Sequence, residues 1–283
     1  MNTSESEKHV KASELEPKRL LLLASLAGLA VLAISIAMFT ALTASAAIPS
    51  GAQSSQPADA QSAREYANDP AALLAAYRHV EVASVSDAIE QLLGQRMYLS
   101  HRMQPIFSTH FSGYALTVRL EKQETHDAHE TDGMLEAIDH GEKNSVYVMS
   151  IEDGADIAGM GGLMGTAMAA REFSGAVIDG AVRDTAYLKK IGFPVYATGV
   201  TPSTLVGHYK FAGSQVPVVI DGVTIHPGDI IAADNDGVAI VPRARAVDVL
   251  LLAQQMDFKE HSMYPLIEKM KSIVTAVKQF GRL

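Results

Sequence analysis

The chain has 283 residues, of which 48% are hydrophobic and 19% charged, and its net charge is −9 at pH 7 because 32 Asp and Glu outnumber 23 Lys and Arg. A surface with this excess of acid repels phosphate backbones and no basic stripe compensates, so nucleic-acid binding is disfavoured. The absence of cysteine excludes thiol nucleophiles, cysteine-bound zinc and iron–sulfur clusters.

The amino-terminal segment has the pattern of an export signal. Residues 20–42 form an uncharged run of 23 residues, enough for a membrane span of ~20 residues. Lys18 and Arg19 precede this run, and Ala44-Ser-Ala46 follows it as a small-residue cleavage pattern. We therefore expect residues 1–46 to be a signal peptide or a retained membrane anchor. Because the positive flank stays in the cytoplasm, the rest of the chain is expected in the periplasm or another extracytoplasmic space. Membrane contact is then expected only through residues 20–42, if they are not removed.

The next segment, residues 47–69, begins with a stretch rich in Ala, Ser, Gln and Pro. Such a composition buries little apolar surface, and we predict a flexible linker here. Residues 70–283 are then expected to form one domain.

Helices and strands are expected to alternate through this domain. Apolar periodicity and turn residues predict helices at 70–78, 84–93, 133–140, 163–171 and 184–190, and a longer pair between 243 and 278. They predict strands at 115–120, 145–151, 176–179, 195–198, 216–220, 230–233 and 238–241. Alternation followed by a strand-rich section indicates the α/β class, with a layered domain built on a mixed sheet.

A polar stretch around His126 and His129 contains several acidic neighbours. In a helix these side chains could bind a transition metal. We favour a solvated loop, because no third, distant ligand is evident.

A glycine-rich loop spans residues 158–165, between a predicted strand and a predicted helix. Glycines let the backbone approach a ligand closely, and N–H groups at the start of a helix can hold a carboxylate or phosphate. The spacing of Gly159, Gly161 and Gly165 does not match a dinucleotide-binding fingerprint. The alternative is that these glycines serve only helix–strand packing.

Arg183 and Asp184 stand side by side where the predicted strand 176–179 turns into the next helix. Active sites of α/β proteins lie at such corners. A guanidinium can grip a carboxylate with two hydrogen bonds, and a carboxylate oxygen suits Mg²⁺ or Mn²⁺. The pair therefore indicates a site for a small anionic oxo acid, whereas the alternative is a helix cap beside a solvated arginine.

The later section, residues 216–242, places turns at Asp221-Gly222, Pro227-Gly228-Asp229 and Asn235-Asp236-Gly237 between apolar strands. Together with the Arg183-Asp184 corner, this order of motifs resembles the RraA-like family, which includes class II 4-hydroxy-4-methyl-2-oxoglutarate aldolases. The resemblance covers roughly residues 84–260. It implies a compact α/β/α fold, also described as a swivelling β/β/α domain, assembled as a homotrimer or hexamer.

The resemblance also implies a role for each site residue. Asp184 would hold a divalent cation, Mg²⁺ or Mn²⁺, and Arg183 would clamp the carboxylate of a small 2-oxo acid. The backbone of the glycine-rich loop would bind the rest of the substrate through Gly161, Gly162, Leu163 and Met164.

This sequence departs from the family pattern at one position. The family normally carries an acid 21 positions before the arginine, where this chain has Gly162. Glu260 is a candidate replacement, because the family often brings an acid from its carboxy-terminal helix across a subunit interface, although a solvated residue on the helix surface is the favoured alternative. Asp179 is another, although its position also fits a turn or a cap.

We therefore expect an exported, divalent-metal-dependent lyase that cleaves or decarboxylates a short 2-oxo acid through a pyruvate enolate. The alternative is a non-catalytic binding or regulatory protein that has lost the loop carboxylate.

Overall fold

The computed structural model describes residues 60–124 and 127–281, which belong to one compact unit, residues 55–283. Within these ranges, no helix combines the length and the apolar character that crossing a bilayer requires. The predicted export segment, residues 1–46, lies outside the described residues.

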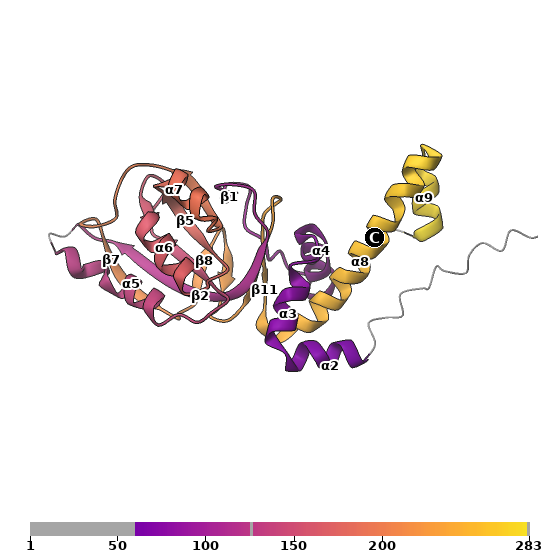
Figure 1. Ribbon diagram of the computed structural model, residues 1–283, viewed down its shortest axis with the longest axis horizontal. Coiled ribbons are helices and arrows are strands. Elements are labelled where there is room, and N and C mark those ends of the chain that lie inside the picture. Colours follow the sequence, from indigo (N-terminus) through magenta and orange to yellow (C-terminus); the bar gives the residue numbers. More distant parts are fainter. Residues whose placement is uncertain (1–59, 125–126, 282–283) are drawn as a thin grey trace, which may run out of the picture. The chain divides into compact units, whose positions relative to one another are not determined.

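One mixed sheet forms the centre of this unit (Figure 1). Its strand order is β1 (Gln104–Pro105), β6 (Val195–Val200), β5 (Gly175–Val182), β3 (Ser145–Ile151), β2 (Phe111–Lys122), β10 (Ile230–Ala233) and β11 (Val238–Val241). Two further strands join it: β4 (Ala158–Met160) pairs with β5, and β7 (Tyr209–Ser214) pairs with β2. The neighbours β2, β3, β5 and β6 are parallel, whereas β1, β7, β10 and β11 pair antiparallel. The predicted α/β class with a mixed sheet is therefore confirmed.

Helices cover one face of this sheet. Tyr147 and Met149 of β3 point to this face and pack against the helices α5 (Asp132–Asp139), α6 (Gly162–Ala170) and α7 (Thr185–Ile191). The same face at the β10–β11 end contacts α3 (Pro70–Tyr77), α4 (Val82–Leu93) and α8 (Ala246–Met270).

A β-hairpin covers the opposite face. Val146 and Val148 of β3 point to this side and pack against the hairpin of β8 (Val218–Ile220) and β9 (Val223–Ile225). Its predicted turn is present, with positive φ at both Asp221 and Gly222, as a type I′ turn requires. Because a hairpin occupies this second layer, the layering is β/β/α, which agrees with the second description of the expected fold and not with α/β/α.

The segment predicted as a linker is partly helical. Residues Ala60–Asn68 form α2, and Tyr66 packs against the cluster of α3, α4 and α8. The linker prediction therefore remains only for residues 47–59, which lie outside the described residues. The carboxy-terminal α9 (Ile273–Phe280) follows α8 as the second member of the predicted helix pair.

Candidate functional site

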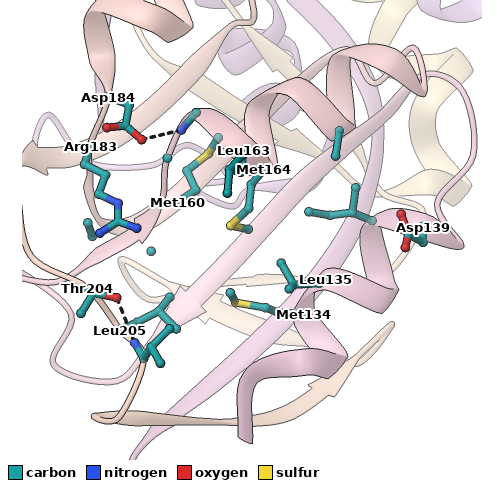
Figure 2. A pocket seen from close by; sticks show the side chains of 17 residues that line it. Met134, Leu135, Asp139, Met160, Leu163, Met164, Arg183, Asp184, Thr204 and Leu205 are labelled. Atoms are coloured by element: carbon teal, nitrogen blue, oxygen red, sulfur yellow. Dashed lines mark hydrogen bonds between the residues drawn. The ribbon is translucent and has the colours of Figure 1, made fainter. Parts of the chain in front are cut away.

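A cavity of about 450 Å³ opens where β4 and β5 end (Figure 2). Its walls come from four parts of the chain: α5, the glycine-rich loop with the start of α6, the Arg183–Asp184 corner, and residues 204–206 after β6. The sequence-predicted residues Gly161, Gly162, Leu163, Met164, Arg183 and Asp184 all line this cavity.

Arg183 is held by its backbone and by the loop that follows β6. Its N–H donates to Met160 O at 3.0 Å, and its guanidinium donates through Nη1 to Ser203 O at 3.2 Å. The Ser203 hydroxyl in turn accepts from Ala158 N at 3.0 Å and donates to Asp156 O at 2.9 Å. Ser203 therefore ties the arginine to the start of β4, while the guanidinium stays exposed enough to meet an anion.

Asp184 has the left-handed backbone conformation, with φ 56° and ψ 33°, immediately before α7. This region is uncommon for residues with a side chain, and such conformations cluster at functional sites. The carboxylate accepts a hydrogen bond through Oδ2 from Gly162 N at 2.9 Å. Figure 2 shows it turned toward the start of α6, whereas the Arg183 guanidinium turns toward Thr204 and Leu205. The two side chains thus share one cavity but face different parts of it.

This arrangement fits a weakly held, water-rich Mg²⁺ or Mn²⁺ site. Asp184 is exposed, and its second oxygen, Oδ1, has no hydrogen-bond partner among the described residues. Mg²⁺ usually binds one or two carboxylates and keeps several waters. Within residues 60–124 and 127–281, no three His, Asp or Glu side chains gather as a ready-made ligand set. Asp184 would be the sole carboxylate ligand from the described part of the chain.

The Arg183 and Asp184 side chains approach the start of α6 closely because its N-cap residue is Gly161. A Cβ atom there would lie 2.7 Å from Asp184 Oδ2 and 3.0 Å from Arg183 Cγ, so a side chain would displace both functional groups. The Gly162 N–H, which we expected to bind substrate, donates instead to Asp184.

The position of the missing acid is next to Asp184. A Cβ atom on Gly162 would lie 3.5 Å from Asp184 Oδ2 and 3.1 Å from Tyr187 Cδ1. An acid at this position would therefore lie beside the Asp184 carboxylate, but the Tyr187 ring would have to move slightly.

The candidate replacements for that acid lie elsewhere in this subunit. Glu260 is outside the cavity on α8, where it accepts a hydrogen bond from Tyr264 Oη at 2.6 Å. Its contribution from a neighbouring subunit stays a prediction. Asp179 is also outside the cavity, and its pKa is raised by burial and by the nearby Asp221, against the opposing effect of Arg102.

The histidine cluster is only partly described. His126 lies outside the described residues, and His129 pairs through Nδ1 with Asp132 Oδ2 at 2.8 Å. This hydrogen bond raises the pKa of His129, as expected for an exposed ion pair at a helix start.

Two walls of the cavity were missed by sequence reasoning. Helix α5 contributes Met134, Leu135, Ile138 and Asp139, and the loop after β6 contributes Thr204, Leu205 and Val206. The rule that ligands bind beyond the carboxyl ends of parallel strands could have identified the loop after β6. No local pattern distinguishes the cavity-facing residues of α5 from ordinary core residues.

The cavity thus lies at the ends of parallel strands and is lined by an exposed arginine and an exposed carboxylate. The model of the RraA-like family, described as Aldolase/RraA, matches residues 82–240, so the chain belongs to this family. The predicted resemblance is thereby confirmed.

Individual proteins also match parts of this chain. A Deinococcus radiodurans protein provisionally named a 4-hydroxy-4-methyl-2-oxoglutarate aldolase is 30% identical over 131 residues, which are 46% of this chain and 76% of the relative. Protein DlpA of Legionella pneumophila is 35% identical over 113 residues, 40% of this chain but only 18% of that protein's length. The crystal structure of Streptomyces coelicolor RraAS2, from the RNase ES inhibitor RraA family, superposes with a TM-score of 0.61 at 23% identity, covering 69% of this chain and 96% of its own. That likeness supports the fold alone.

Proposed function

We propose that this protein is an exported lyase that needs a divalent cation and cleaves or decarboxylates a short 2-oxo acid, such as 4-hydroxy-4-methyl-2-oxoglutarate or oxaloacetate. The observation that carries the proposal is the convergence of Arg183, Asp184 and the start of α6 on one cavity. The provisional aldolase name of the Deinococcus relative supports the same reaction class.

The reaction generates negative charge on a pyruvate enolate, and the site contains a group suited to that charge. Arg183 is permanently positive, so it can clamp the pyruvoyl carboxylate and stabilise the enolate. Its contact with Ser203 O orients the guanidinium before substrate arrives. Asp184 would hold Mg²⁺ or Mn²⁺ through Oδ1. Such an ion, when bound, supplies Lewis acidity at the 2-oxo group.

The reaction also needs a proton acceptor. Gly162 carries no acid, and Glu260 lies away from the cavity of its own subunit. We propose a homotrimer or hexamer in which a neighbouring subunit contributes Glu260. Light scattering of the purified protein tests the assembly, and a monomer with full activity would contradict this role for Glu260.

The central experiment measures pyruvate release. The purified protein is incubated with oxaloacetate and with 4-hydroxy-4-methyl-2-oxoglutarate, with Mg²⁺ or with a chelator. We expect metal-dependent release, reduced at least about 100-fold by Arg183→Ala because removing one preorganised group that stabilises transition-state charge has effects of this order. Asp184→Asn should weaken the metal dependence.

The matched control is Arg245→Ala, which removes an exposed arginine paired with Asp248 outside the cavity. Its pyruvate release should equal that of the parent. If no condition gives metal-dependent release and Arg183→Ala behaves like the parent, the alternative holds: a binding or regulatory protein on this scaffold. The loss of the loop acid at Gly162 is the observation that favours this alternative.

Export is proposed from the sequence of residues 1–46. The mass of the protein recovered from its native host shows whether residues 1–46 are removed, and recovery from the cytoplasmic fraction with an intact amino terminus would contradict export.

A further inference from the structure

The cavity is polar only at its edges. Arg183 and Asp184 lie on one side, and Asp139 of α5 lies on the other, with Met134, Met160 and Met164 between them in the view of Figure 2. These three methionines come from α5, β4 and α6, and each is at least nine-tenths buried. Methionine adapts its shape to irregular apolar groups. The middle of the cavity is therefore an apolar surface.

The rim of the cavity is also apolar. Leu163 of α6 is 91% exposed, Leu135 of α5 is 44% exposed, and Val206 of the loop after β6 is 43% exposed. Single exposed apolar residues are ordinary, but their gathering around one opening marks a binding surface. The three residues come from three separate elements, so their clustering does not follow from the apolar periodicity of a single helix.

Charge limits which ligands can occupy the end of the cavity next to Asp139. Arg183 is the one cationic side chain among the described residues that line it. A dicarboxylate would use Arg183 for its first carboxylate, and its second would extend over apolar side chains toward the acidic Asp139. An unpaired carboxylate in such surroundings is unfavourable because it loses hydration without gaining a partner.

The size of the cavity also indicates a ligand larger than pyruvate. Its volume of about 450 Å³ lies within the range of ~300–1,000 Å³ typical of sites for drug-sized ligands. Pyruvate alone would leave most of the apolar surface in contact with water.

We propose that the physiological substrate is a 2-oxo monocarboxylate with an uncharged aliphatic tail of several carbons. Its carboxylate lies on Arg183, and its tail lies against Met134, Met160 and the rim residue Leu163. This inference rests on the proposed function for the position of the carboxylate, and for the same site it ranks a monocarboxylate above the dicarboxylates 4-hydroxy-4-methyl-2-oxoglutarate and oxaloacetate.

The reaction of such a substrate balances without any further reactant. In 4-hydroxy-2-oxooctanoate, loss of the 4-hydroxyl proton is coupled to breaking the C3–C4 bond, whose electron pair passes to C3 of the pyruvate enolate. Pentanal leaves, and a proton added at C3 gives pyruvate. The tail remains on the aldehyde, so its contacts do not change the bonds that break.

Binding measurements test the tail independently of catalysis. Calorimetric titration of the full chain with pyruvate, 2-oxobutanoate, 2-oxohexanoate and 2-oxooctanoate should show affinity rising about fourfold for each methylene buried. 2-Oxoglutarate should bind at least about tenfold more weakly than 2-oxohexanoate, because its second carboxylate meets no cation. A flat affinity series, or equal binding of these two acids, would overturn the proposal.

Substitutions around the cavity test which residues contact the aliphatic tail. Leu163→Ser and Leu135→Ser should reduce the gain per methylene, whereas Asp139→Lys should raise affinity for 2-oxoglutarate. Val219→Ser is the matched control, because Val219 is 56% exposed on β8, outside the cavity. If Leu163→Ser dissociates an oligomer and leaves the affinity series unchanged, the rim is a subunit contact and the proposal fails.

Pyruvate release separates this inference from the proposed function. Faster release from 4-hydroxy-2-oxooctanoate than from 4-hydroxy-4-methyl-2-oxoglutarate supports both. Affinity that rises with chain length, without pyruvate release from either compound, keeps the tail site and rejects the lyase. Release from both compounds with a flat affinity series keeps the lyase and rejects the tail site.

Discussion

At the scale of single residues, the site depends on what surrounds Asp184. The carboxylate is oriented by one backbone N–H and leaves one oxygen for a cation, while Gly161 and Gly162 leave space on both sides of it. An acid at position 162 would lie beside Asp184 and in contact with Tyr187. The aromatic ring therefore occupies part of the space that the family's usual acid would need.

Gly162→Glu tests whether this site lacks only that acid. We expect faster pyruvate release, because the new carboxylate could accept a proton beside Asp184, the residue proposed to hold the cation. The increase should be larger in Gly162→Glu/Tyr187→Ala, since removing the ring frees space for the new Cβ. Tyr187→Ala alone is the control. An unchanged or lower rate in both folded variants would show that other parts of the site have also diverged.

At the scale of elements, the site depends on the close packing of α6 against α7. A Cβ atom on Gly165 of α6 would lie 2.3 Å from Cδ2 of Leu188, which is fully buried on α7. The start of α6 supplies the Gly162 N–H, and the residue before α7 is Asp184. The distance between these helices therefore sets the hydrogen bond that orients the carboxylate.

Gly165→Ala should lower the free energy of unfolding by about 1–3 kcal/mol, because overpacking outweighs the better helix propensity of alanine. Denaturant unfolding measures the change. In a Leu188→Ala background the same substitution should become neutral or stabilising, because the added methyl group fills the space. Equal effects in both backgrounds would mean that the two residues are not coupled.

At the scale of the whole molecule, the hairpin layer is fastened to the segment before β1 by one carboxylate. Asp221 accepts hydrogen bonds from Ser100 N at 2.8 Å and Ser100 Oγ at 2.7 Å, and it pairs with Arg102. Burial alone would raise the pKa of Asp221, but these hydrogen bonds lower it below its usual value. The ionised carboxylate therefore fastens the hairpin to the segment before β1.

A carboxyl group whose pKa is lower in the folded state stabilises the protein above its unfolded pKa, and this contribution is lost as the pH falls through the folded pKa. Asp221→Asn should therefore lower the free energy of unfolding by about 1–3 kcal/mol at pH 7. The difference from the parent should shrink below about pH 4, where the unfolded carboxyl becomes protonated. Asparagine tolerates the left-handed turn conformation, so the substitution isolates the charge.

Asp179→Asn is the control for this measurement. Because burial raises the pKa of Asp179, ionisation at neutral pH opposes folding, and its replacement should be neutral or stabilising. Denaturant unfolding of both variants from pH 3 to pH 7 tests the pair. A difference between Asp221→Asn and the parent that stays constant over this range would contradict a role for the charge.

Local patterns were enough to predict much of this protein. The bounds of β3, β10 and β11 agree with the predicted strands residue for residue, and the Asp221-Gly222 turn and the strand–glycine loop–helix order are as expected. These features depend on neighbouring residues: apolar runs, turn chemistry and helix starts. The same local motifs, in their order, were sufficient to identify the family.

Tertiary structure decided what no local pattern encodes. Strand β7 lacks a clear alternation of buried and exposed residues and forms by pairing with β2, far away in sequence. A hairpin, not helices, covers the second face of the sheet because β8, with Val218 and Ile220, packs against β2 and β3. Met134 lines the Arg183 cavity, Ser203 contacts the Arg183 guanidinium, and Asp179 does neither, because long-range packing determines which groups meet.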